Sequence, residues 1–182
     1  MIELMLSSGG VEGRNEGVAL VGESEAWADP DFAVACRVAD IWADLQADLE
    51  PGARPTRHDV DPLRFGAALL PHLVLIDVLA QDRPGGPRDF RFRLFGSRHE
   101  SEYGGDLTGR TLSEVARESP DAEALAAFLD AAVDATAPTY VRFSYRSRGQ
   151  VVHYALAVAL PLFDETDAVS HLLVAADWRS PE

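Results

Sequence analysis

Six polar-tipped side chains are the candidates for binding a ligand in this sequence. They are one guanidinium, two imidazoles and three phenols: Arg93, His99, Tyr103, Tyr145, His153 and Tyr154. If Arg93 projects into a cavity, it favours an anionic ligand such as a carboxylate, because a buried guanidinium needs a partner. If instead backbone carbonyls or an acidic neighbour hold Arg93, its function is structural. The sequence alone leaves both orientations of Arg93 open, and that of Arg91 with them.

The histidines and the single cysteine limit the cofactors that the chain could hold. Noncovalent haem would need a histidine on a cavity face, and the candidates are His99, His153 and His171. A lone histidine is more often a hydrogen-bonded structural residue than a haem ligand. Cys36 can form no internal disulfide and has no second cysteine for a metal site, and there is no Cys-x-x-Cys-His motif for covalent haem. We therefore predict no metal ligand, and the cofactor stays unknown.

An enzyme is the alternative class of function. His153 and His171 could face each other on adjacent strands and, with Asp177, form an acid–base group in a cone-shaped α+β barrel of the ketosteroid-isomerase kind. Such an enzyme would act on a small carbonyl compound. The chain has no Gly-x-Ser-x-Gly, P-loop or His-Glu-x-x-His motif, and its carboxylates cluster in turns and on helix faces, where solvation explains them. We predict no catalytic residue.

The overall charge restricts the partners of the chain. The formal net charge of the 182 residues is −14, and all 16 basic residues are arginine. Nucleic acids and anionic lipid surfaces would repel such a chain at long range, so we predict neither as a partner. A single cysteine suits a reducing compartment, and no apolar run approaches the roughly 20 residues that a membrane span needs. We expect a soluble, cytoplasmic protein.

The densest local signals lie between Asp89 and Val115. Phe90, Phe92 and Leu94 alternate with Arg91, Arg93 and Phe95, which predicts a strand with one wholly apolar face. Ser97 with Glu100, and Thr111 with Glu114, have the spacing of a capping box, so we expect a short helix at each. Gly104 and Gly105 should end the first of these helices.

The remaining patterns predict the elements that surround this stretch. Residues 31–50 keep a helical period, and their apolar stripe could pack on the rest of the domain or on the same stripe of a second chain. We also predict a short helix over 63–70, a later helix with apolar positions from Leu125 to Val133, and strands over 72–79, 139–147, 151–162 and 169–178. In the strand over 151–162, His153 shares its face with three alanines, and this small face lets something lie close to the sheet.

Five short motifs in a fixed order carry a resemblance to a known family. They are a tryptophan helix, a Pro-x-Arg loop, an Asp-x-Asp-Pro turn, a strand ending in Gly-Ser, and a Gly-x-Asp-Leu-Thr-Gly turn; here these are Trp42, Pro55 to Arg57, Asp59 to Pro62, Phe90 to Ser97, and Gly105 to Gly109. Over about residues 37–178 the chain resembles a family of stand-alone bacterial PAS domain proteins.

The resemblance implies an α+β PAS fold, with a five-stranded antiparallel sheet and helices over one face around a small cavity. It implies a sensory or protein-interaction module in bacterial signalling, without enzymatic activity and with no universal cofactor. Photoactive flavin-binding relatives need a cysteine in the central helical segment, and this segment has none. The expected ligand is a small molecule bound between the sheet and the helices, and the expected partner is a signalling protein.

These expectations divide the chain into three parts. Residues 1–28 should be a flexible tail, because Gly, Ser and Glu dominate and the apolar patch at Val18 to Val21 is brief. Residues 29–52 should form the N-terminal amphipathic helix, and 53–182 the PAS domain. We predict a homodimer through the helix over Asp31 to Glu50.

Overall fold

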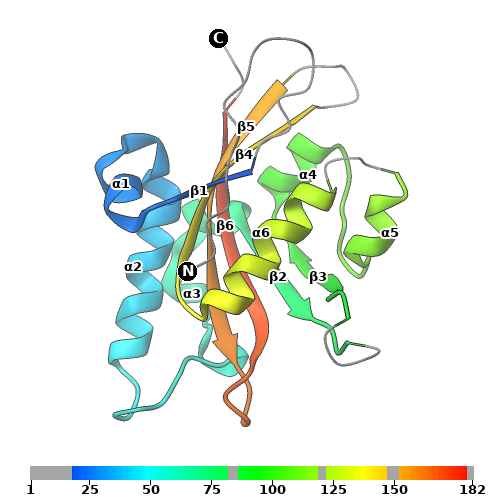
Figure 1. The fold of residues 1–182 in the computed structure, drawn as a ribbon. Coiled ribbons are helices and arrows are strands. Elements are labelled where there is room, and N and C mark those ends of the chain that lie inside the picture. The colour runs from blue at the N-terminus through cyan, green and yellow to red at the C-terminus, as the bar shows by residue number, and fades with distance from the viewer. Residues whose placement is uncertain (1–17, 82–85, 119–121, 147–151, 180–182) are drawn as a thin grey trace.

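The structure is a computed structural model that describes residues 18–81, 86–118, 122–146 and 152–179. One antiparallel sheet forms its centre, with helices on both sides (Figure 1). The strand order is β1-β4-β5-β6-β2-β3, and the strands are β1 Val18–Val21, β2 Leu73–Val78, β3 Phe90–Phe95, β4 Thr139–Arg146, β5 Val152–Phe163 and β6 Val169–Arg179. The five strands predicted after residue 70 are confirmed, and the sheet has a sixth.

The sixth strand, β1, lies within the residues that we expected to be a flexible tail. It pairs with β4 from Val18 opposite Phe143 to Val21 opposite Tyr140, and α1 (Glu23–Ala28) follows it with Ala26 buried. The apolar patch offers too little burial by itself, but the edge of β4 supplies backbone hydrogen-bond partners and a surface to pack on. The expectation neglected this distant partner. Residues 1–17 of the expected tail lie outside the described residues.

The helices form two layers rather than one. On one face of the sheet lie α4 (Ser97–Tyr103), α5 (Leu112–Ala116) and α6 (Ala122–Ala135); on the other lie α1, α2 (Ala33–Ala47) and α3 (Pro62–Leu69) (Figure 1). Three short 3-10 turns join these elements at Pro30–Phe32, Arg57–Asp59 and Leu70–His72. The N-terminal helix α2 therefore covers the second face of the sheet, for which the resemblance to PAS domains implied no helices.

Helix α2 packs its apolar stripe on the chain's own sheet, which is one of the two alternatives left open by its amphipathic pattern. Its buried residues, including Val38, Trp42 and Leu45, face the chain's own sheet, and α2 contacts β5 and β6. The exposed side of the helix carries Arg37 and Asp40. The apolar stripe thus contributes to the core of one chain.

The alternation of β5 separates the two cores. Ala155, Ala157 and Ala159 belong to the cluster under α4–α6, whereas Leu156 and Val158 belong to the cluster under α2. Successive residues of a strand point to opposite faces, so one strand presents small side chains to one layer and large ones to the other. The small face predicted from the sequence is confirmed for these alanines.

The start of α4 depends on Gly96 rather than on the predicted capping box of Ser97 and Glu100. The helix itself is confirmed, but Gly96 is its N-cap residue and no side chain caps it. The Gly96 N–H donates to the Leu73 carbonyl at 2.9 Å, and a Cβ at residue 96 would collide with the carbonyl oxygens of Pro71 and Leu73. This close approach requires glycine. The second predicted capping box, Thr111 with Glu114, is present at α5.

The Gly-x-Asp-Leu-Thr-Gly turn protects the outer edge of β3. The Gly109 N–H donates to the Phe92 carbonyl at 2.6 Å, and the Phe92 N–H donates to the Arg110 carbonyl at 3.0 Å. Gly109 has a φ of 88°, which favours glycine. The turn also buries Leu107 beneath it, so it both covers the edge strand and contributes to the inner core.

Candidate functional site: a cavity between the sheet and helices α4 to α6

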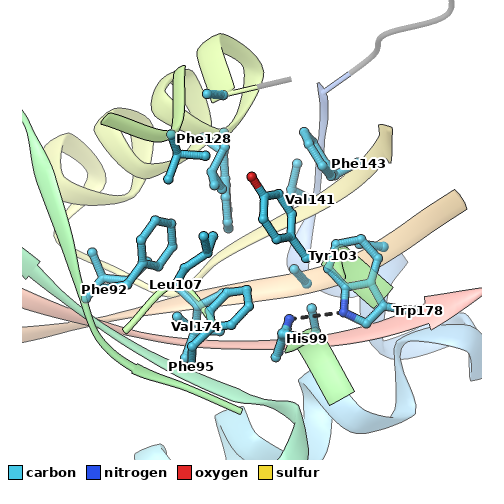
Figure 2. Close-up of a pocket in the computed structure, with 18 residues that line it drawn as sticks. Phe92, Phe95, His99, Tyr103, Leu107, Phe128, Val141, Phe143, Val174 and Trp178 are labelled. Atoms are coloured by element: carbon cyan, nitrogen blue, oxygen red, sulfur yellow. Dashed lines mark hydrogen bonds between the residues drawn. The ribbon is translucent and has the colours of Figure 1, made fainter. Parts of the chain in front are cut away.

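A cavity of about 120 Å³ lies between the sheet and the layer of α4, α5 and α6 (Figure 2). Both layers contribute to its wall. The lining residues are nearly all apolar or aromatic: Val74, Ile76, Phe92, Phe95, His99, Tyr103, Leu107, Val115, Ala122, Leu125, Phe128, Val141, Phe143, Ala155, Ala157, Val174, Ala176 and Trp178. The alanines of β5 and β6 make the room, because larger residues there would fill the space.

The size of the cavity limits what it can hold. An apolar cavity of ~150 Å³ engineered into another protein stays dry and binds benzene or xenon. The cavity here is of similar size, at about 120 Å³, and of similar lining. In this conformation it therefore suits a molecule of about one aromatic ring.

Two hydrogen bonds hold His99 in the wall. The Trp178 Nε1–H donates to His99 Nδ1 at 3.0 Å, and His99 Nε2 lies 2.8 Å from the His72 carbonyl oxygen (Figure 2). An indole N–H can only donate, so Nδ1 is the acceptor and the ring proton resides on Nε2, which donates to the carbonyl. This arrangement assigns one neutral tautomer and ties α4 to the end of β6.

Burial keeps His99 neutral. It lowers the pKa of the His99 imidazole to about 4, against the opposing effect of the hydrogen bond to His72. Both ring nitrogens are already hydrogen-bonded, so ligation of haem iron by His99 would require breaking one of the two bonds. The geometry therefore assigns His99 a positioning role in the cavity wall.

Among the described residues of the cavity wall, Tyr103 supplies the one hydroxyl (Figure 2). It is the last residue of α4, immediately before Gly104, which ends the helix with a φ of 89°. Its ring packs edge-on against Phe95, with ring centroids 6.4 Å apart. Within the described residues the Tyr103 hydroxyl has no hydrogen-bond partner, and it is available to a ligand.

Arg93 lies on the other side of the sheet from the cavity. Its Nε donates to Asp77 Oδ1 at 3.1 Å and its Nη2 to Asp77 Oδ2 at 2.8 Å. The Asp77 side chain is 10% exposed, whereas that of Arg93 is 60% exposed. Arg93 therefore pairs with an acidic neighbour, the second of the two alternatives left open by the sequence. It is absent from the cavity lining.

A β-bulge at Arg93 reverses the faces predicted for the end of β3. Leu75 is opposite Leu94 and Ile76 is opposite Phe92, which leaves Arg93 as the extra residue. A bulge of this kind shifts the alternation by one residue. Phe95 therefore lines the cavity, and Leu94, expected on the apolar face, is 46% exposed. The prediction was right for Phe90 and Phe92 and wrong beyond the bulge.

The other three candidate residues lie on β4 and β5. Tyr145 and His153 are opposite each other in the sheet register, but their side chains lie outside what the structure describes. Tyr154 is 48% exposed and is not part of the lining. It shares its strand face with Leu156 and Val158, which point to the α2 layer.

The acid–base group of the enzyme alternative does not gather at the cavity within the described residues. His171 Nε2 lies 3.5 Å from Asp77 Oδ1, and burial lowers the pKa of its imidazole. Asp177 lies 3.6 Å from His72 and 3.3 Å from Arg179. Neither His171 nor Asp177 lines the cavity, and no carboxylate is part of its described wall.

The sequence reasoning missed the two aromatic residues that complete the wall beside His99. Trp178 could have been found from the alternation of the last strand, in which Val174, Ala176 and Trp178 share a face. Phe95 could not, because the bulge that redirects it follows from the pairing of β3 with β2. The ring centroids of Phe95 and Trp178 both lie within 6 Å of that of His99, at 5.5 and 5.6 Å.

Cys36 lies on the other side of the sheet from the cavity. It is buried in the cluster under α2, and its Sγ lies 3.6 Å from the Ala26 carbonyl. Cys36 is the single cysteine of the sequence, so a flavin bound in the cavity would have no thiol beside it with which to form an adduct.

Within the described residues, no helix is both long enough and apolar enough to cross a membrane.

Of the comparisons with known proteins, the match to a family model agrees with this architecture. No curated protein matches the sequence. One solved structure, described as "Structure of an RNA-binding Light-Oxygen-Voltage Receptor", aligns with a TM-score of 0.43 and 16% identity over 70% of this chain, a likeness too distant to support any inference about function. The chain spans about a third of that protein, 36%. The family model for a PAS domain matches residues 33–175. All the described lining residues except Ala176 and Trp178 lie within this match. This chain belongs to the PAS domain family.

Proposed function

We propose that this chain is a sensory or protein-interaction module that takes a small molecule into the cavity and passes the signal on by contact with another protein. The observation that carries the proposal is the apolar cavity between the two layers, with a tyrosine hydroxyl in its wall. Cavities of this kind, mostly apolar with a few polar groups, are the usual form of a small-molecule site.

The position of the cavity suits a sensor. Its wall combines residues of β2 to β6 with residues of α4, α5 and α6. A ligand that binds one arrangement of these layers better than another shifts the population toward that arrangement. The bond from Trp178 to His99 links the wall to the last described strand, β6. Occupancy would then change the surface that a partner protein contacts.

The proposal includes no catalytic step, and it places the protein in the cytoplasm with a signalling protein as its partner. The described part of the wall offers a neutral histidine with both nitrogens bonded and one tyrosine, and such a pair lacks the acid and base that turnover of a carbonyl compound needs. The enzyme alternative therefore has no support from the cavity.

The homodimer through the N-terminal helix remains a prediction from the sequence. The apolar residues of α2 already pack on β5 and β6, so a second chain would have to meet its exposed side, which carries Arg37, Asp40 and Asp44. Light scattering across a range of protein concentrations tests this prediction. A dimer mass that Asp40→Arg and Asp44→Arg together abolish would support it, and a monomer mass at every concentration would refute it.

Native mass spectrometry of the protein from its own host tests the proposed cavity function. We expect a bound small molecule on the wild-type chain and none on Ala157→Leu, because the larger side chain fills the space. Circular dichroism and thermal unfolding verify that the variant is folded. A molecule retained equally by the wild type and the folded variant would place the site elsewhere and contradict the proposal.

A further inference from the structure

We infer that the cavity selects an uncharged, mostly apolar molecule of about one aromatic ring with a single hydrogen-bonding group, which the Tyr103 hydroxyl engages. This inference rests on the proposed function, since it names the ligand class of the same cavity. It replaces the anionic ligand that an inward-facing Arg93 would have favoured, because Arg93 pairs with Asp77 on the other side of the sheet.

The charge of the ligand follows from the wall. Among the lining residues that the structure describes there is no arginine, aspartate or glutamate, and the chain contains no lysine. His99, the one imidazole there, is neutral. An ionised ligand would lose its hydration without gaining a counter-charge, and this costs far more than the apolar contacts return. The cavity therefore discriminates against carboxylates and ammonium groups.

The number of polar groups on the ligand follows from which polar atoms in the wall are already bonded. Side-chain nitrogen or oxygen atoms occur on three lining residues, His99, Tyr103 and Trp178. The two His99 nitrogens bond the His72 carbonyl and the Trp178 indole. The Tyr103 hydroxyl alone is left for a ligand within the described wall, and it can donate or accept. One hydroxyl or carbonyl on the ligand matches it.

The preference for a ring follows from the size and the lining together. Rings of Phe92, Phe95 and Phe128 face the cavity, along with those of Phe143, Tyr103 and Trp178 (Figure 2). Aromatic rings pair edge-to-face or offset, and each pairing adds stability beyond the buried area. A planar ring can make several such pairings at once in a cavity of about 120 Å³.

Three probes of nearly equal shape separate these properties: phenol, toluene and benzoate, each titrated into the full chain at pH 7 and followed by amide chemical shifts in NMR. Phenol has the ring and a neutral hydroxyl, toluene has the ring alone, and benzoate has the ring with a negative charge. We expect phenol to bind more tightly than toluene by about two- to tenfold, the range of one net hydrogen bond. We expect benzoate to bind most weakly.

Tyr103→Phe is the matched variant, because it removes the hydroxyl and keeps the ring. We expect phenol binding to fall to the level of toluene or below it, because the phenol hydroxyl would lose its hydration without gaining a partner, and we expect toluene binding to stay unchanged. Benzoate bound as tightly as phenol by the wild type, or a preference for phenol that survives in Tyr103→Phe, would overturn the inference. Either result would leave the cavity itself intact as a binding site.

Ala157→Leu separates failure of this inference from failure of the proposed function. If all probes that bind the wild type are lost in this folded variant, the cavity is their site, and their order then decides the ligand class. If none of the three probes binds the wild type, the inference is overturned. An anionic molecule found by native mass spectrometry, lost in Ala157→Leu, would overturn the ligand class and sustain the proposed function.

Discussion

The two faces of the sheet are built differently. Under α2, large side chains such as Leu160 on β5 and Phe32 before α2 are fully buried. Under α4 to α6, β5 presents alanines and leaves a cavity of about 120 Å³. One face is thus packed to hold the fold together, and the other has space for a ligand.

The largest difference should come from truncating a leucine on each face. Leu160→Ala removes a fully buried side chain under α2 and should cost about 3 to 5 kcal/mol of unfolding free energy. Leu107→Ala removes one that already borders empty space, so it loses fewer contacts and should cost about 2 kcal/mol. Urea unfolding measures both. An equal or larger cost for Leu107→Ala would show that the cavity face is packed as tightly as the other.

The cavity face should also account for acid sensitivity through His99. In the unfolded chain the pKa of histidine is near 6.5, whereas in the fold burial lowers the pKa of His99 to about 4. Between these two values the unfolded chain binds a proton that the folded chain does not, so stability falls as the pH falls from 6.5 to 4. Above pH 6.5 the contribution is constant. The expected loss is on the order of 3 kcal/mol.

Urea unfolding of the wild type and His99→Gln at several pH values measures this contribution. The variant should lack the part of the pH dependence that His99 causes, because glutamine does not titrate. Parallel stability curves for the two proteins between pH 6.5 and 4 would contradict the buried, neutral assignment of His99.

Two alanines on the same face of β5 test where the empty space lies. Ala157 lines the cavity and Ala159 is fully buried outside it. Ala157→Leu should fill the cavity and raise the unfolding free energy by about 1 kcal/mol. Ala159→Leu should overpack the core and lower it by about 1 to 3 kcal/mol. The same sign of change for both variants in thermal unfolding would refute this placement of the cavity.

The smallest change in stability should come from Arg93→Ala, because the guanidinium is exposed and its pairing with Asp77 is screened by water. The effect should instead reach the cavity indirectly. Arg93 is the bulge residue beyond which Phe95 turns inward, so NMR shifts of Phe95 and its neighbour His99 should change. Arg91→Ala is the matched control on the same strand. Equal spectra at Phe95 in both variants would remove any positioning role for Arg93.

The sequence patterns predicted those parts of the fold that depend on neighbours along the chain. The alternation of β5, the capping box at Thr111 and the helical period of α2 are local, and the structure has all three. The pairing of β1 with β4 and the bulge at Arg93 depend on partners distant in sequence. A period of two or 3.6 residues holds no information on such partners, so these features were missed.

For the same reason, the structure places only some of the candidate residues in the cavity wall. His99 and Tyr103 lie in the cavity wall, because both belong to a short helix whose place after β3 could be inferred. Arg93 and Tyr154 do not line it. The face on which Arg93 lies depends on the buried carboxylate of Asp77 in the next strand. A charged side chain on a strand that borders a cavity is thus a weaker indication of a binding site than a strand face of small residues, because the small residues themselves create the space.

A structure of the full chain with phenol tests the central claim most directly, namely that the face under α4 to α6 holds the ligand. We predict one phenol in the cavity, its ring among Phe92, Phe95 and Trp178 and its oxygen within hydrogen-bond distance of the Tyr103 hydroxyl, with the α2 face unchanged. Phenol bound at any other place, with the cavity left empty, would contradict the account.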